Sequence, residues 1–300
     1  MLDALILTLS HAAEASISAF PNALSSPSSR LFWPLLITPL LFIIVVTGLR
    51  FGKAAGIQQC QAFLNPKQFF TRDSLIDIAL LLFNAGAKIA VVIPLLGGKL
   101  AVAMAVSLFL QQQVGDGIFA GHTFNGMLVI SVFSLAFFIA EDASRFGLHY
   151  TMHKVPLLWK LHQVHHSAHT LTPLTLHRVH PLEMALYYLR SILVFGLMAG
   201  SFTWALQSPA TVWAFLGVDA LGFIFNACAA NLRHSGVYLS FGWLERFFIS
   251  PAQHQIHHSS ALEHHDKNFG TCLSLWDKLA KSWVASEKQA ENPLQFGIYK

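Results

Sequence analysis

The 300-residue sequence is poor in charged residues and in cysteine. Charged residues make up 11% of the chain and apolar residues 54%, whereas soluble domains usually carry about a quarter charged residues. This shortfall indicates a chain that buries much of its surface in lipid. Three cysteines, Cys60, Cys228 and Cys272, are too few and too scattered for a disulfide framework or a thiolate metal site.

A basic stripe and a leader segment are also missing. The 19 Lys and Arg residues barely outnumber the 15 Asp and Glu residues, and they form no cluster of the kind that nucleic acid binding requires. No Lys/Arg-rich stretch precedes the first apolar run, so a cleavable signal peptide is not expected. We therefore expect an integral membrane protein that binds no nucleic acid.

Long apolar runs are abundant instead, and a membrane-spanning helix needs roughly 20 such residues. The predicted fold class is all-α, a multi-pass membrane helical bundle. Spanning helices are predicted over residues 31–49, 75–97, 126–140, 184–206 and 209–228, the last two forming a hairpin. The apolar run 100–110 is too short to span and is predicted to be re-entrant or interfacial.

The basic residues of one loop give the orientation of this bundle. Residues 50–73 contain Arg50, Lys53, Lys67 and Arg72, and loops rich in Lys and Arg lie in the cytoplasm. Alternation from there puts residues 142–183 and everything after residue 228 on the cytoplasmic side.

Histidine is concentrated on that side, because 14 of the 16 histidines lie between His149 and His265. Eight of them form three sets: His149 and His153; His162, His165 and His166; His254, His257 and His258. Residues three or four apart share a helix face, whereas adjacent residues diverge by about 100°. The doubled histidines can therefore serve two metal ions, or one ion from two sides. For isolated histidines such as His11 and His122, ordinary packing is the better interpretation.

This many imidazoles indicates a catalytic metal centre. Imidazole suits Fe, Zn, Cu and Ni, and eight or more exceed what one ion can use, so two ions are implied. A structural zinc site closes with four ligands, and four-helix di-iron proteins use Glu-x-x-His pairs that are missing here. The pattern favours a non-haem di-iron oxygen centre in a histidine-rich cytoplasmic cap.

Several further stretches surround these sets. They are Glu141-Asp142, Arg178-Val-His180-Pro181-Leu-Glu183, Asn231-Leu-Arg-His234-Ser235, Ser250-Pro251 and His264-His265-Asp266-Lys267-Asn268-Phe269-Gly270. With the histidine sets, they resemble the fatty acid hydroxylase superfamily, which includes the sterol desaturase family, and especially its bacterial-type members. The resemblance covers about residues 137–281. We therefore divide the chain into an N-terminal transmembrane region (1–136), a di-iron domain of this type (137–281) and a C-terminal tail (282–300).

The resemblance implies a set of site residues. The implied metal ligands are His149, His153, His162, His165, His166, His180, His234, His254, His257 and His258. Many members carry one more histidine where this chain has Ala229 and Ala230, and His234 is the candidate replacement; His180 could instead be a helix-entry residue. Residues expected to support the ligands are Asp142, Asn231, His265 and Asp266, with His265 also a possible ligand. No catalytic residue is expected apart from the ligands.

The implied activity uses two iron ions, O2 and external electrons to hydroxylate or desaturate a lipid, such as a sterol, a fatty acyl chain or an alkyl ether. The sequence lacks a dinucleotide-binding glycine fingerprint, a flavin motif and an iron–sulfur thiolate set, so the electron donor is expected to be a separate protein, either a reductase or a small redox carrier. The alternatives are a histidine-rich membrane metal transporter or sensor, a bis-histidine haem protein and a zinc-dependent lipid hydrolase. A transporter would place its histidines along the spans, and a haem protein would place single histidines deep inside them.

Overall fold

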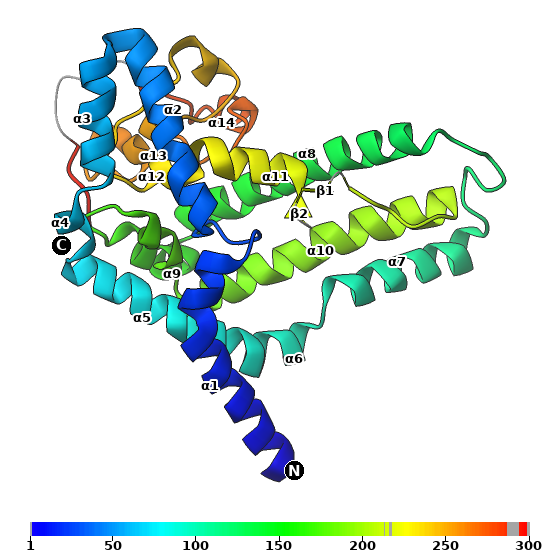
Figure 1. The fold of residues 1–300 in the computed structure, drawn as a ribbon. Helices are drawn as coiled ribbons and strands as arrows, with labels where there is room; N and C mark the ends of the chain where they lie inside the picture. The colour runs from blue at the N-terminus through cyan, green and yellow to red at the C-terminus, as the bar shows by residue number, and fades with distance from the viewer. Residues whose placement is uncertain (1, 213, 216–217, 287–293, 299–300) are drawn as a thin grey trace.

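The computed structural model describes residues 2–212, 214–215, 218–286 and 294–298. These residues are mostly helical (Figure 1), which confirms the predicted all-α class. The α-helices are α1 (Leu2–Ser25), α2 (Trp33–Phe51), α3 (Lys53–Phe63), α4 (Pro66–Phe69), α5 (Arg72–Ala87), α6 (Ile93–Leu96), α7 (Lys99–Val114), α8 (Gly126–Lys154), α9 (Pro156–His166), α10 (Pro181–Leu206), α11 (Ala220–Phe225), α12 (Asn231–Arg233), α13 (Pro251–His257) and α14 (Leu275–Leu279).

Shorter elements connect these helices. Two are π-helical, η1 (Lys88–Val92) and η3 (Asn226–Ala230), and three are 3-10 helices, η2 (Pro173–His177), η4 (Gly242–Arg246) and η5 (Leu262–His264). The strands β1 (Ala214–Phe215) and β2 (Val218–Asp219) have two residues each and pair antiparallel.

Among the described residues, four apolar helical stretches are long enough to cross a membrane, which makes the chain an integral membrane protein. They are Trp33–Phe51, Arg72–Val114, Gly126–Lys154 and Pro181–Leu206. The predicted spans 31–49, 126–140 and 184–206 correspond to three of them. The predicted span 75–97 and the short run 100–110 belong to the fourth, a 43-residue stretch. This stretch is interrupted between α6 and α7 at Gly97 and Gly98, where Gly97 has a φ of 71°.

The predicted span 209–228 is wrong. Its described residues include the short β1–β2 ladder, in which Ala214 pairs with Asp219, then the six-residue helix α11 and the start of η3. The Asp219 carboxylate accepts a hydrogen bond from the Gly222 N–H at 2.6 Å, which starts α11 in the middle of the apolar run. The hydropathy of this run shows that it is apolar. It does not distinguish a membrane-spanning helix from an extended segment that runs back along the bundle. Figure 1 shows the chain returning from the far end of α10 in this way.

The long helices α7, α8 and α10 run side by side (Figure 1). Two glycines one turn apart on α10 allow α7 to approach closely. A Cβ on Gly200 would lie 2.6 Å from the carbonyl oxygen of Ala103, and one on Gly196 would lie 2.3 Å from Cγ1 of Val102. This small-xxx-small spacing is how helices pack in a membrane, where apolar burial contributes little. Both α8 and α10 contact α9, and farther along the chain α12 contacts α13 and α2. We call residues 155–180 and 231–286 the cap.

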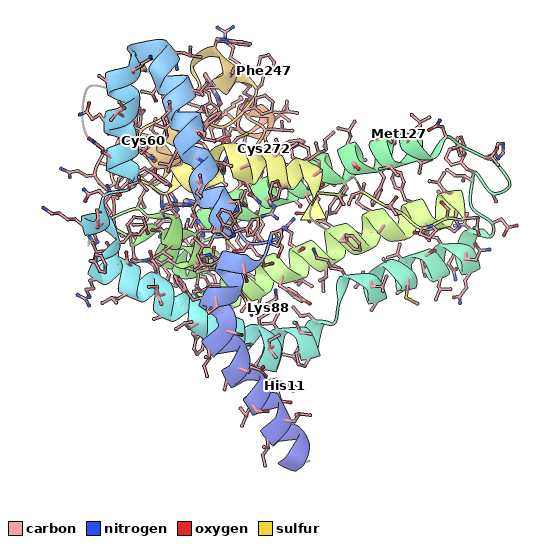
Figure 2. The ribbon with its side chains drawn as sticks, viewed as in Figure 1. His11, Cys60, Lys88, Met127, Phe247 and Cys272 are labelled. Atoms are coloured by element: carbon pink, nitrogen blue, oxygen red, sulfur yellow. The ribbon has the colours of Figure 1, made fainter. Side chains whose placement is uncertain are left out.

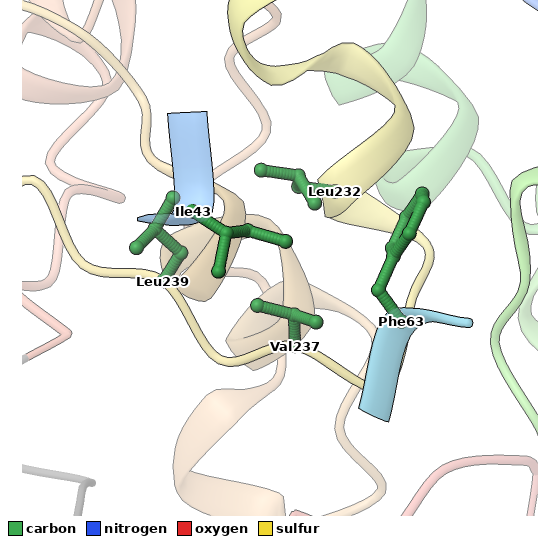
Figure 3. Close-up of a cluster of buried hydrophobic side chains, with 5 residues drawn as sticks. All are labelled: Ile43, Phe63, Leu232, Val237 and Leu239. Atoms are coloured by element: carbon green, nitrogen blue, oxygen red, sulfur yellow. The ribbon is translucent and has the colours of Figure 1, made fainter. Parts of the chain in front are cut away.

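The hairpin of α2 and α3 supports the cap. Ile43 from α2 and Phe63 from α3 pack with Leu232, Val237 and Leu239, and all five side chains are at least 95% buried (Figure 3). Burying side chains of this size stabilises a fold by about 1.5–3 kcal/mol each. The segment that contains His234 is therefore fixed in place by the N-terminal part of the chain.

The cysteines have no covalent role. Cys60, Cys228 and Cys272 are all free, and Figure 2 labels Cys60 on α3 and Cys272 in the cap. Burial raises the pKa of Cys272 to about 12, so this thiol stays protonated and is a packing residue.

Candidate metal centre

Nine histidines converge where the end of α8 meets the cap, in two groups of possible metal ligands. The first group is His149, His153, His162, His166 and His257, and the second is His165, His234, His254 and His258. Within each group, the nitrogens that face one another all lie within 4.8 Å. Two nitrogens on opposite sides of one metal ion are about 4.2 Å apart, given metal–nitrogen bonds of about 2.1 Å. Each group is thus about the size that one ion needs.

Local helix signals bring these residues together. α9 begins with Pro156 in its first turn, a position that suits proline. α13 begins with a capping box, in which Ser250 accepts from the Gln253 N–H and the Gln253 side chain accepts from the Ser250 N–H. The resulting helices carry the doubled histidines.

The doubled histidines divide between the two groups. On α9, His166 belongs to the first group and His165 to the second; on α13, His257 belongs to the first and His258 to the second. The rings of His166 and His258 stack at 4.4 Å between centroids, so the groups adjoin. The geometry therefore favours two ions over one ion approached from two sides.

The first group is pre-organised by its outer nitrogens. Three of its histidines direct Nδ1 at fixed acceptors: His149 donates to the Phe269 carbonyl at 2.7 Å, His162 to the Glu183 carboxylate at 2.7 Å, and His257 to the Lys267 carbonyl at 2.8 Å. An Nδ1–H bond of this kind fixes the tautomer and leaves the Nε2 lone pair for a metal.

The inner nitrogens of the first group have no partner. The Nε2 atoms of His149, His153, His162, His166 and His257 are all buried without a hydrogen-bond partner in the described part of the chain. Buried polar atoms are normally satisfied. Five such atoms facing one another fit a metal ion that accepts their lone pairs.

The second group is held less firmly. The Nε2 atom of His234 lies 3.1 Å from that of His254 and 3.1 Å from that of His258. His165 has a backbone hydrogen bond with Arg178, and its Nδ1 is buried without a partner among the described residues. The convergence of His234 with the second group supports its candidacy as a replacement ligand.

The environment keeps these imidazoles neutral. Burial lowers the pKa of His162 and of His165 to about 3. Burial also lowers the pKa of His254, His257 and His258. Neutral imidazole is the form that binds metal, so the site is ready for an ion at pH 7.

His180 lies outside both groups. It caps α10, where its Nδ1 accepts a hydrogen bond from the Leu182 N–H at 3.1 Å. This matches the helix-entry role that the sequence had left open, so His180 is not part of the ligand set that we propose below.

Asp142 supports the site indirectly, through the loop that follows Phe269. Its carboxylate accepts three hydrogen bonds of 2.9 Å, from the N–H groups of Cys272 and Leu273 and from the Trp276 indole. It thereby fixes the loop that presents the Phe269 carbonyl to His149. The expected direct contact between Asp142 and an imidazole is not found among its hydrogen bonds.

The other expected supporting residues differ in their positions. Asp266 forms an ion pair with Lys154 at 2.6 Å and lies 3.9 Å from Nδ1 of His153. His265 is exposed. Asn231 is buried, and its amide donates to the carbonyls of Arg30 and Leu35, so it anchors the N-terminal region rather than a ligand.

Two supports were missed in the sequence. Glu183 is buried against His162, and only its place in the Arg178–Glu183 stretch could have signalled this role. Arg178 donates to Asp77 at 2.6 Å and to Asp73 at 2.8 Å, and Asp73 also accepts the N–H groups of His169 and Thr170. This network fixes the loop between α9 and α10 to α5, and no signal near the histidines pointed to α5.

A cavity of about 540 Å³ opens beside both groups. His149, His162, His165, His234 and His254 line one side of it, and α5 and α10 contribute apolar side chains such as Leu81, Ala85 and Met184. Since α5 and α10 belong to candidate spans, an apolar molecule in the membrane can lie close to the histidines.

Comparisons with known proteins agree with these features. The sequence profile of the fatty acid hydroxylase family matches residues 134–282. The chain is 25% identical to alkylglycerol monooxygenase from Homo sapiens over 51% of this chain and 31% of that protein. It is 29% identical to ornithine lipid hydroxylase OlsE from Rhizobium tropici over 45% of this chain and 38% of that protein. The chain spans about a third of the length of these relatives, and no solved structure matches it.

Proposed function

We propose that the chain is a membrane-bound di-iron oxidoreductase of the fatty acid hydroxylase family, whose sequence profile matches residues 134–282, and that it uses O2 to hydroxylate a lipid. The observation that carries this proposal is the convergence of nine histidines, eight of them buried, in two adjoining groups beside a cavity lined in part by α5 and α10. The names of the relatives refer to hydroxylation and monooxygenation of lipids, which favours hydroxylation over desaturation.

The nine histidines of the two groups are the proposed ligands. Imidazole accepts several metals, but zinc has no redox chemistry, and O2 activation requires a metal that changes oxidation state. A pair of iron ions would supply this oxygen activation.

The remaining tasks belong to the chain. Phe269, Glu183 and Lys267 hold the Nδ1 protons of three ligands, which keeps the Nε2 atoms directed inward. Burial of the ligands excludes water from the centre, and the cavity wall formed by α5 and α10 receives the apolar substrate.

We also propose the partner, the orientation and the domain division. Each turnover needs two electrons, and the sequence has no motif for a flavin, a nicotinamide or an iron–sulfur cluster, so a separate redox protein supplies them.

The cap faces the cytoplasm, as the basic loop 50–73 indicates. Labelling of a cysteine introduced at the exposed residue Arg246 from the cytoplasmic side alone supports this orientation, and labelling from the other side alone contradicts it. The division at residues 136 and 281 stands as proposed.

Metal analysis with oxygen uptake tests the function. The full chain is purified in detergent, stripped, and reloaded with ferrous ion or zinc. We expect about two iron ions per chain, and oxygen uptake that requires iron, a reductant and added lipid. Equal activity with zinc, or lipid cleavage without oxygen uptake, would contradict the proposal. Metal transport into proteoliposomes without oxygen uptake would favour the transporter.

A further inference from the structure

The cavity beside the histidines has a strongly basic wall. Its lining includes Arg30, Lys88, Arg145, Arg190 and Arg233, whereas Glu183 is the acidic residue of the lining. The basic residues come from distant parts of the chain, namely the segment before α2, η1, α8, α10 and α12. An apolar substrate alone would gain nothing from such a wall.

Two of these cations already have a carboxylate partner. Glu141 accepts hydrogen bonds from Arg145 at 3.2 Å and from Arg190 at 3.0 Å. Glu183, for its part, accepts the Nδ1–H of His162. The acidic groups near the wall are therefore committed to other partners.

Arg233 and Arg30 form no ion pair with any residue that the structure describes. Arg233 is 3% exposed, and its Nε and Nη2 atoms are buried without a hydrogen-bond partner among the described residues. Asp142 and Asp277 are near Arg233, but their carboxylates accept backbone and side-chain donors of residues 269–282. The Arg233 guanidinium lies over the ring of Phe225, 4.8 Å from the ring centroid. This contact gives its Nε and Nη2 atoms no hydrogen-bond acceptor, and burying a charge without an anionic partner is costly.

Arg30 lines the same cavity as Arg233. Burial, followed by the charges of Arg145 and Arg233, lowers the pKa of Arg30 to about 9, so it remains charged at pH 7. Arg30 is therefore close enough to Arg145 and Arg233 for their positive charges to act on it. A guanidinium presents a planar fork of donors that matches a carboxylate or a phosphate.

We propose that Arg233 and Arg30 bind the anionic group, a carboxylate or a phosphate, of an amphipathic lipid whose apolar chain leaves the cavity between α5 and α10. Arg233 directly precedes His234, and both line the cavity. The acid group therefore lies next to the histidine groups, and the carbon that is oxidised is near the acid group rather than at the far end of the chain. The position of oxidation rests on the proposed function, but the binding does not.

Equilibrium binding tests this proposal without turnover. Iron-loaded full chain in phosphatidylcholine nanodiscs is titrated with a fluorescent lysophosphatidic acid. Unlabelled competitors are the fatty acid and the monoacylglycerol of the same chain length, together with inorganic phosphate. We expect both acidic lipids to compete at least about tenfold better than the neutral monoacylglycerol, the effect of losing one charge-assisted pair. Competition by monoacylglycerol at the same concentration overturns the proposal. Competition by inorganic phosphate as strong as that of the lipids overturns the assignment to a lipid.

Variants assign the effect to the two arginines. Arg233→Gln and Arg30→Gln should each remove most of the preference for acidic lipid, and Arg30→Lys should restore part of it. The matched control is Arg246→Gln, because Arg246 is exposed and outside the cavity. Iron content reports whether each variant folds. If Arg233→Gln loses its iron, the lipid preference of Arg30→Gln alone tests the proposal. An unchanged preference in Arg30→Gln overturns the proposal.

Activity is read separately from binding. Oxygen uptake of the same preparation tests the proposed function, and mass spectrometry of the product locates the new hydroxyl. Selective binding without oxygen uptake contradicts the proposed function but supports the anion site. Oxygen uptake on monoacylglycerol as fast as on the acidic lipids contradicts the anion site but supports the proposed function.

Discussion

The two histidine groups differ in what holds them. In the first group, His149, His162 and His257 each have the outer nitrogen bonded to a fixed acceptor of the chain. In the second group, the described bonds of His234 are to His254 and His258, which are possible ligands themselves. Three histidines of the first group are therefore oriented by the chain before a metal binds, whereas in the second group a bond of this kind is described for His165 alone, with the Arg178 backbone. This difference predicts unequal affinities for the two ions.

Removing a ligand from the first group should have the largest effect. His162→Ala is expected to lower iron content and turnover at least about 100-fold, since losing an outer partner alone typically costs 10–100-fold. Iron analysis and oxygen uptake measure this. His265→Ala is the matched control, because His265 is exposed and outside both groups. Full activity of His162→Ala would remove the first group from the centre.

Removing the acceptor of His162 should have a smaller effect, confined to one group. Glu183→Ala is expected to weaken metal binding in the first group about 10–100-fold, with Glu183→Gln in between because an amide oxygen can still accept. Competition with a metal-binding dye gives both affinities. Glu263→Ala is the control, since Glu263 is exposed. If Glu183→Ala instead lowered the metal affinity of the second group, Glu183 would not be the residue that orients the first group.

The wild-type chain should lose its two ions in sequence. Titration with a chelator is expected to empty the second group first, with dissociation constants about tenfold apart, the size of effect attributed to outer partners. Iron content and absorbance followed together should show two steps. A single cooperative step would mean that the outer bonds of the first group confer no advantage.

The smallest effect is expected at Asp266. Its side chain is 45% exposed and 3.9 Å from Nδ1 of His153. Pairs this exposed contribute about 0–1 kcal/mol, so Asp266→Asn should change metal affinity by less than about fivefold. A loss as large as that of Glu183→Ala would show that His153 is anchored as firmly as His162.

The sequence predicted the parts of the centre that depend on local helix geometry. A spacing of four residues places His162 with His166 and His254 with His258 on common faces. Four of the five predicted spans, 31–49, 75–97, 126–140 and 184–206, likewise lie in the candidate spanning stretches. Both are properties of a single helix, which a pattern along the chain describes directly.

Contacts between distant elements could not be predicted in this way. Glu183 reaches His162 across 21 positions, and Asp77 reaches Arg178 across 101. The region predicted as the span 209–228 depends on the pairing of β1 with β2 and on the helix cap at Asp219, neither of which hydropathy reports. Asn231 was expected beside the ligands, yet it bonds Arg30 and Leu35 because the N-terminal region folds back onto the cap.

The most direct test of the two-ion centre is Mössbauer spectroscopy of the full chain loaded with iron-57, beside the His254→Ala variant. Two irons per chain in two distinguishable sites are expected, with His254→Ala keeping the signal of the first group and losing that of the second. A single iron site in the wild-type chain, or equal loss of both signals in the variant, would contradict the account.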